Sequence, residues 1–232
     1  DGSKAVLMIS PPRPDGPPVR NGKPYSAIAR LAEDIRPFIA VDEALRAQDL
    51  CAPAIYAYDA EAGLAVLEDL GAEPVVDANG PMPERYAEAT AVLAALHGRA
   101  LPQDLPLEGA PAYRVPPYDI DALTIEIELI LEWYAPHVAR TQLSSSARAA
   151  FINLWRPLLQ QICAGPATWA LRDYHSPNLI WLPEREGLHR IGIIDFQDCV
   201  MGHPAYDVVS LLQDARVTVS DELELKLLSH YA

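Results

Sequence analysis

Three side chains suited to metal-assisted chemistry lie in two neighbouring stretches of the sequence. LRDYHSPNLIW, residues 171–181, contains Asp173 and Asn178, and IGIIDFQD, residues 191–198, contains Asp195. Asparagine and aspartate supply the hard oxygen ligands that Mg²⁺ prefers in proteins. A second aspartate that does not bind the metal can orient an attacking hydroxyl group and accept its proton. Phosphoryl transfer requires this kind of positioning and charge neutralisation.

The hydrophobic runs around these residues predict the strands that would position them. TWALR, residues 168–172, ends just before Asp173, and NLIWL, residues 178–182, begins at Asn178. IGIIDF reads as a buried strand with Asp195 near its end, and the polar segment LPEREGLH before it predicts a hairpin turn. We therefore expect the three polar side chains to meet at one mouth.

Each of these residues also has a purely structural interpretation. Asp173 could cap a turn, and Asp195 could cap the end of a strand. Asn178 could simply favour a turn after Pro177. Asp198 could approach the metal site or be a solvated loop acid. The combination of residue types at these spacings favours the chemical interpretation.

The remaining sequence predicts a β-rich first part and a mainly helical second part. Short apolar runs bounded by turn residues predict strands at 4–9, 54–59 and 64–71. Apolar spacing near 3.6 residues predicts helices over 25–48, 82–100, 118–138, 145–163, 205–215 and 221–231. The proline-rich segments 11–24 and 101–118 are predicted to be loops. The fold class is therefore α+β, with an incomplete first lobe over 1–70 and a second lobe over 71–232.

Composition narrows the class of protein. Half of the 232 residues are hydrophobic, which is a globular composition. The net charge of −14 disfavours nucleic acid and anionic membrane as partners. Apolar runs of about 18 residues, which a membrane-spanning helix needs, do not occur in the sequence. The three widely spaced cysteines suit a reducing cytoplasm rather than a disulfide framework.

Both ends of the chain look interrupted. The sequence starts at Asp1 without an initiator methionine and runs at once into a strand pattern. It stops at Ala232 within a helical pattern. We therefore expect this chain to be a fragment of a longer gene product.

The motifs resemble those of a known group of kinases. Asp173-x4-Asn178 followed by Asp195-Phe196 resembles the catalytic loop and metal-binding motif of the protein-kinase-like superfamily. The longer pattern RDYHSPN, IDFQD and GHPAYDVVSLLQDAR resembles the aminoglycoside phosphotransferase family of small-molecule kinases. Within that family it looks most like the bacterial cell-wall sugar kinases that phosphorylate the anomeric hydroxyl of N-acetylmuramate and N-acetylglucosamine. The resemblance implies a two-lobed protein-kinase-like fold, ATP as phosphoryl donor, Mg²⁺, and a role in peptidoglycan recycling.

The resemblance also implies roles for individual residues of the second part. Asp173 corresponds to the catalytic base, and Asn178 and Asp195 correspond to the Mg²⁺ ligands. Asp207 resembles the acid that braces the catalytic loop from the following helix, and His175 is expected to support the loop from within. The family resemblance also allows a fusion of this chain to an upstream ATPase domain in the full gene product.

Nucleotide binding is expected to involve the first part of the chain. LEDLG, residues 67–71, resembles the hinge between the lobes, where the backbone of Glu68, Asp69 and Leu70 would hold the adenine. Glu43 resembles the helical acid that pairs with a lysine on a neighbouring strand in this superfamily.

Two positions depart from the family pattern. Leu171 stands where many relatives have histidine, and Met8 stands where the superfamily usually has its phosphate-binding lysine. Lys4 is on the same face of the strand as Met8, but four residues span roughly 13 Å. Either another group replaces the lysine, or nucleotide binding is weak.

Two other functions stay open at this level. Glu126, Glu128 and Glu132 could attract a cationic acceptor, which keeps an aminoglycoside or another small alcohol as an alternative substrate. The departure at Met8 keeps open a non-catalytic binding module, or pseudokinase. Nucleotide binding with and without Mg²⁺ would separate this second alternative from the enzymes.

Overall fold

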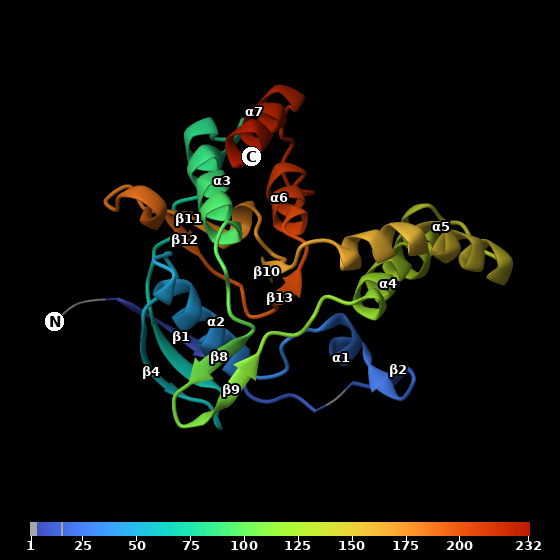
Figure 1. Cartoon of the computed structure of the whole chain (residues 1–232), viewed down its shortest axis with the longest axis horizontal. Helices are drawn as coiled ribbons and strands as arrows, with labels where there is room; N and C mark the ends of the chain where they lie inside the picture. The colour runs from blue at the N-terminus through green and yellow to red at the C-terminus, as the bar shows by residue number, and fades with distance from the viewer. Residues whose placement is uncertain (1–3, 15) are drawn as a thin grey trace.

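The first lobe is built on a three-stranded antiparallel sheet with the strand order β1–β5–β4 (Figure 1). The computed structural model describes residues 4–14 and 16–232. The strands are β1 (Ala5–Ile9), β4 (Ile55–Asp59) and β5 (Leu64–Glu68). Ala65 and Leu67 of the central strand are buried and alternate with exposed neighbours, so one face of the sheet covers the core. The three strands predicted in this part of the sequence are confirmed.

The helical pattern over 25–48 forms two helices rather than one. α1 (Tyr25–Ala29) ends at Arg30, which has a positive φ of 62°. α2 (Arg36–Ala47) begins with Pro37 in its first turn, where a missing backbone N–H costs nothing. Pro37 therefore starts a helix.

The prediction of a loop over 11–24 is wrong for its second half. β2 (Pro18–Arg20) pairs antiparallel with β3 (Lys23–Pro24). Asn21 and Gly22 connect the two strands with φ values of 51° and 74°. Asn-Gly is the favoured sequence for a two-residue hairpin turn with positive φ at both positions. The sequence therefore contained a hairpin signal, although the surrounding prolines favoured a loop.

The prediction of a loop over 101–118 is also wrong. β8 (Asp104–Leu107) and β9 (Ala110–Arg114) form an antiparallel hairpin that packs against α2. Leu105 and Leu107 point into the core, and the residues that alternate with them are exposed. A two-stranded hairpin tolerates prolines because each strand keeps a free edge.

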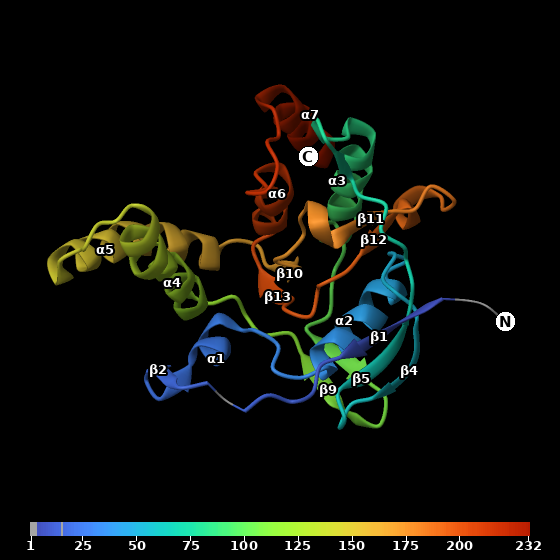
Figure 2. The ribbon, with the colours of Figure 1, turned by 180° about the vertical axis from the view of Figure 1, so that it is seen from behind.

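The second lobe contains two groups of helices. The first group packs together above the short strands between residues 168 and 202, and the chain ends beside it (Figure 1). It consists of α3 (Pro83–His97), α6 (Ala205–Leu212) and α7 (Asp221–Tyr231). α4 (Ile120–Leu129), the π-helix η1 (Ile130–Val138) and α5 (Ser145–Ala164) extend away as an arm, with α1 packed against α4 (Figure 2). Helices are confirmed in all five segments predicted for this lobe, although the one over 118–138 changes from α to π.

Four short buried strands position the catalytic segment. β10 (Thr168–Ala170) pairs with β13 (Val200–Gly202), and β11 (Leu179–Trp181) pairs with β12 (Ile191–Ile193). The 3-10 helix η2 (Ser176–Asn178) precedes β11, and another, η3 (Gly187–Arg190), lies in the hairpin before β12. A further small hairpin joins β6 (Val76–Asp77) and β7 (Gly80–Pro81).

One hydrophobic core extends from α2 and β5 to the catalytic strands. Phe38 of α2 stacks on Phe196, with ring centroids 5.0 Å apart and planes within 14°. This contact joins the first lobe to the segment that contains Asp195. The division of the chain near residue 70 stays a prediction. In the described part of the chain, no helix combines the length and apolar character that crossing a bilayer requires.

Candidate active site

The catalytic segment leaves β10 through a strained turn. Arg172 has a positive φ of 67°, and the Asp173 N–H donates to the Leu171 carbonyl at 2.8 Å, which makes a γ-turn. The carboxylate of Asp207 accepts hydrogen bonds from the backbone N–H of Leu171 at 2.7 Å and of Arg172 at 2.9 Å. Asp207 is fully buried, and His97 Nε2 lies 3.5 Å from it. Asp207 thus stands where the sequence predicts a brace.

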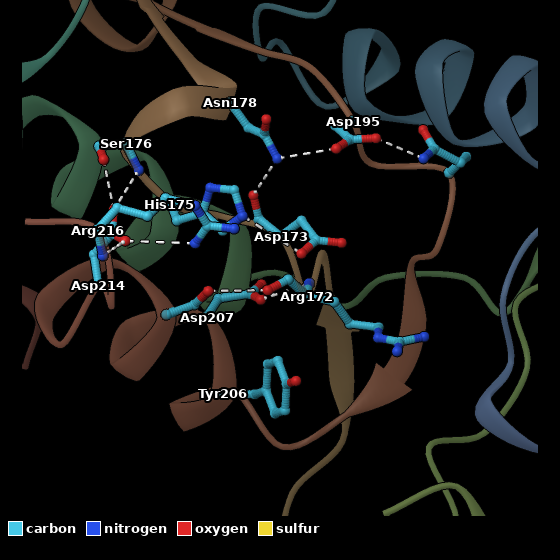
Figure 3. A network of polar contacts seen from close by, with 12 residues as sticks. Arg172, Asp173, His175, Ser176, Asn178, Asp195, Tyr206, Asp207, Asp214 and Arg216 are labelled. Atoms are coloured by element: carbon cyan, nitrogen blue, oxygen red, sulfur yellow. Dashed lines mark hydrogen bonds and ion pairs between the residues drawn. The ribbon is translucent and has the colours of Figure 1, made fainter. Parts of the chain in front are cut away.

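Asp173 emerges from this turn with its carboxylate half exposed (Figure 3). It lines a cavity of about 560 Å³ together with Arg172, Tyr118 and Tyr206. His175 Nε2 lies 3.5 Å from Asp173 Oδ1, and the His175 ring is buried beneath the loop. The carboxylate is therefore accessible to a molecule bound in the cavity, which His175 also lines. The supporting role of His175 stays a prediction.

Asn178 forms hydrogen bonds to both of the other predicted site residues, Asp173 and Asp195. Its Nδ2 donates to the Asp173 carbonyl at 3.0 Å and to Asp195 Oδ2 at 3.2 Å (Figure 3). Asp195 is exposed, has a positive φ of 61°, and accepts a hydrogen bond from Gln197 Nε2 at 2.6 Å. The structure thus brings Asp173, Asn178 and Asp195 together at one mouth.

The mouth fits a divalent cation that is also held by phosphate oxygens. Asn178 uses its nitrogen within the loop, so its Oδ1 is the atom that would face a cation beside the Asp195 carboxylate. Among the described residues, no group of three or more His, Cys, Asp or Glu side chains is arranged to hold a metal. Mg²⁺ typically takes only one or two protein carboxylates and completes its shell with water and substrate phosphates, so two ligands suffice.

Asp198 connects this mouth to the first lobe. Its Oδ1 accepts a hydrogen bond from the Ala32 N–H at 2.6 Å. Burial raises the pKa of Asp198, and the nearby carboxylates of Asp173 and Asp195 raise it further, while the bond from Ala32 opposes the rise. Asp198 is therefore a partly buried, hydrogen-bonded acid, and its approach to a metal stays a prediction.

A second buried aspartate holds the loop from the other side, and sequence reasoning missed it. Asp214 Oδ2 accepts hydrogen bonds from the backbone N–H of Ser176 at 3.0 Å and from Ser176 Oγ at 2.5 Å (Figure 3). Burial by itself raises the pKa of Asp214, but these bonds and one from the Arg216 N–H bring it below its usual value. Asp214 is therefore held as a carboxylate that orders η2.

The predicted hinge borders a second cavity, of about 320 Å³, between the lobes. Glu68, Asp69 and Leu70 line one side, and mainly apolar residues of β1, α2 and the catalytic strands line the rest. The Glu68 side chain is bonded to Arg185 at 2.5 Å, and its backbone N–H donates to the Ala54 carbonyl at 2.8 Å. The hinge backbone groups that could meet a ligand are therefore the Glu68 carbonyl and the backbone of Asp69 and Leu70.

The acids of α2 are arranged differently from the sequence prediction. Glu43 is exposed, whereas the neighbouring Asp42 is fully buried. Neither carboxylate oxygen of Asp42 has a hydrogen-bond partner among the described residues. Burial raises the pKa of Asp42 to about 7. Asp42 follows the buried Phe38 by four residues and so shares its face of the helix, a signal that the sequence contained.

The strand position that departs from the family pattern borders the cavity beside the predicted hinge. Met8 is half-buried and lines the cavity at the hinge, while Lys4 is exposed just before β1. Whether Lys4 reaches a bound nucleotide stays a prediction.

Residues 2–232 match the phosphotransferase enzyme family along nearly the whole chain. The chain belongs to this family. It is 39% identical over 230 residues to a protein of Caulobacter vibrioides named N-acetylmuramate/N-acetylglucosamine kinase, which covers 97% of this chain and 63% of that protein. A protein of the same name from Pseudomonas putida is 32% identical over 186 residues, covering 80% of this chain and 51% of that protein. The chain thus spans little more than half the length of these curated relatives.

Solved structures with the same fold include family members of other specificities. A choline kinase from Streptococcus pneumoniae matches with a TM-score of 0.61 at 18% identity, covering 100% of this chain and 68% of that one. An aminoglycoside phosphotransferase from Streptomyces rimosus, in complex with ADP and streptomycin, matches with a TM-score of 0.55 at 17% identity, covering 87% and 77%. These matches confirm the protein-kinase-like fold predicted from the motifs.

Proposed function

We propose that this protein is a kinase that transfers the γ-phosphoryl group of ATP to a sugar hydroxyl. The acceptor would be the anomeric hydroxyl of N-acetylmuramate or N-acetylglucosamine, and the products would be a sugar phosphate and ADP. The observation that carries the proposal is the hydrogen-bonded arrangement of Asp173, Asn178 and Asp195, in which Asp173 lines a cavity. The names of the two curated relatives supply the acceptor class.

Asp173 is the group that would act on the acceptor. Its half-exposed carboxylate faces the larger cavity, so an acceptor hydroxyl bound there can donate a hydrogen bond to it. As the hydroxyl oxygen forms its bond to the γ-phosphorus, the bond from that phosphorus to the bridging oxygen breaks. The hydroxyl proton passes to Asp173 and then to solvent.

Asn178 Oδ1 and Asp195 would hold Mg²⁺ at the mouth. The ion, when bound, neutralises charge on the β- and γ-phosphates. The hydrogen bond between Asn178 and Asp195 keeps both ligands on one side of the mouth. The bond from Asn178 to the Asp173 carbonyl joins the metal position to the base.

The adenine would bind in the cavity at the hinge. Its walls are apolar side chains such as Val6, Met8 and Ile180, which suit an aromatic base. Because the Glu68 N–H is already bonded within the protein, we assign the adenine contacts to the Glu68 carbonyl and to the backbone of Asp69 and Leu70.

The acids that could attract a cationic antibiotic are already neutralised. The three glutamates that keep the antibiotic alternative open each form an ion pair with an arginine. The pairs are Glu126 with Arg172, Glu128 with Arg20, and Glu132 with Arg148. This arrangement favours a neutral or anionic sugar over an aminoglycoside as acceptor.

The remaining predictions about the protein's setting are unchanged. The cysteines in the described chain are free, and Cys51 and Cys199 are buried, which suits the cytoplasmic location we propose. A fusion to an upstream ATPase domain stays a prediction.

The decisive experiment supplies the full-length protein with Mg-ATP and one of three acceptors: N-acetylmuramate, N-acetylglucosamine or kanamycin. Phosphorus NMR identifies the product, and Asp173→Asn is the control. An anomeric sugar phosphate that disappears in the variant is the expected result. Phosphorylated kanamycin would replace the sugar with an antibiotic acceptor. ATP binding without product from any acceptor would contradict the proposed reaction and favour the pseudokinase.

A further inference from the structure

Arg172, the residue before Asp173, is held in place at its backbone on both sides. Its N–H donates to Asp207 at 2.9 Å, and its carbonyl accepts from Ser210 Oγ at 3.0 Å. A residue with a side chain adopts a positive φ such as its 67° only where the surroundings determine it fully. The strained turn therefore sets the direction in which Asp173 leaves the strand.

The side chain of Arg172 adds contacts to three other segments. Nη1 donates to the Ala29 carbonyl at 2.9 Å, and Nη2 donates to Glu126 Oε1 at 2.5 Å. The guanidinium carbon lies 5.2 Å from the centre of the Tyr118 ring, within range of a cation–π contact. Only 9% of this side chain is exposed, so the contacts are shielded from water.

These contacts connect the catalytic loop to the first lobe through the α1 segment, residues 25–34. This segment precedes α2, which packs on Phe196, and its Ala32 N–H donates to Asp198 at 2.6 Å. Arg30 of the segment also pairs with Asp119 at the start of α4. The α1 segment thus touches the catalytic loop, the metal-binding loop and the arm at once.

We propose that Arg172 is a positioning residue that aims Asp173, and that catalysis depends on the docking of the α1 segment on the second lobe. The proposal rests on the proposed kinase function. Glu126 and the Ala29 carbonyl hold the guanidinium from two sides, and the γ-turn transmits this restraint to the next residue. Without it the turn relaxes, and the Asp173 carboxylate no longer meets the acceptor hydroxyl in line with the γ-phosphate.

The test compares Arg172→Lys with the wild type. Lysine keeps the charge, but its single amine cannot bond Glu126 and the Ala29 carbonyl in the geometry of a guanidinium. We expect kcat to fall on the order of 100-fold, while KM for ATP, which binds in the other cavity, changes less than about threefold. Arg156→Ala, which removes an exposed arginine of α5, is the matched control and should leave kcat unchanged.

A second variant separates positioning from folding. Glu126→Gln keeps an acceptor oxygen but loses the charge, so we expect a smaller fall in kcat than for Arg172→Lys. The double variant should be no slower than Arg172→Lys alone, because both changes remove the same restraint. Independent, multiplying effects in the double variant would overturn the proposal.

A crystal structure of Arg172→Lys tests the positioning whatever the acceptor. We expect residue 172 to leave the positive φ region and the Asp173 carboxylate to turn away from the cavity. An unchanged Asp173 together with an unchanged kcat would overturn the inference. A displaced Asp173 in a protein whose wild type phosphorylates no sugar would support the positioning role and count only against the proposed substrate.

Discussion

Two pairs of acids, Asp173 with Asp207 and Asp42 with Glu43, differ in how the fold accommodates them. In the loop region, Asp207 is fully buried and accepts two backbone hydrogen bonds, while Asp173 is half exposed beside a cavity. In α2, Asp42 is fully buried with no partner among the described residues, while Glu43 is exposed. Asp207 and Asp42 are therefore equally buried, but only Asp207 has hydrogen-bond donors around its carboxylate among the described residues.

The difference teaches that burial alone does not assign a role to an acid. Hydrogen bonds from two backbone N–H groups compensate the Asp207 side chain for its loss of hydration. Asp42 has no such compensation, and its pKa rises to about 7. An exposed acid at a cavity, such as Asp173, is free for chemistry because the fold does not depend on it.

The largest expected effect is on activity, at Asp173. Asp173→Asn should lower kcat by about 10²–10⁴-fold, since the amide cannot accept the hydroxyl proton. Stability should change little, because the side chain is half exposed. Phosphorus NMR rates and chemical denaturation of the same preparation check both statements. A variant that keeps wild-type activity would remove Asp173 from the mechanism.

The next effect is on stability, at Asp207. Asp207→Ala leaves the buried N–H groups of Leu171 and Arg172 without an acceptor, and we expect the free energy of unfolding to fall by about 3–5 kcal/mol. Ser210→Ala removes a single bond to the Arg172 carbonyl and should cost only about 1 kcal/mol. Urea denaturation measures both losses. Equal losses would show that Asp207 is not the main brace.

Replacing Asp42 should stabilise the protein, in contrast to replacing Asp207, and the gain should depend on pH. Its pKa in the folded protein is about 7, above its ordinary value of 3.8, so its ionisation opposes folding, and the penalty grows between about pH 4 and pH 7. Asp42→Asn should raise the free energy of unfolding by up to about 4 kcal/mol at pH 8 and by far less at pH 4. Parallel pH profiles for variant and wild type would mean that Asp42 has a partner in solution.

Glu43 should give the smallest effect. Because Glu43 is exposed, Glu43→Gln should change the free energy of unfolding by less than about 0.5 kcal/mol at any pH. If Glu43 nevertheless pairs with a cation when nucleotide binds, as the family resemblance implies, the Kd for Mg-ATP will rise in this variant. Calorimetric titration of the Glu43→Gln variant with Mg-ATP measures this Kd. An unchanged Kd would contradict the predicted role of Glu43 in nucleotide binding.

Much of the fold could be predicted because its signals are local. Apolar periodicity located the strand Ala5–Ile9 and the helices from Pro83 onward. The hairpins at 18–24 and 104–114 were missed because their prolines indicate loops, whereas pairing of strands depends on a second segment. The change to a π-helix at Ile130 likewise has no clear local signal.

In the candidate site, too, the contacts set by local spacing could be predicted from the sequence, whereas the long-range contacts could not. The spacing of Asp173, Asn178 and Asp195 placed them together before any coordinates, because two short strands and a tight hairpin leave little freedom between them. The partner of Arg172, by contrast, lies 46 residues away in Glu126, and the Ala29 carbonyl lies 143 residues away. No sequence pattern marks such a backbone carbonyl as a ligand.

Residue types and their spacing were therefore enough to predict which side chains could hold a metal, which could accept a proton, and to which family the chain belongs. The burial of Asp42 without a partner among the described residues became visible only in the folded chain. The same is true of the hydrogen bonds by which Asp207 and Asp214 hold the loop, and of the contacts by which Arg172 joins the loop to the first lobe. The physical reason is that residue type sets what a group can do, whereas desolvation and long-range hydrogen bonds depend on neighbours that only folding brings together.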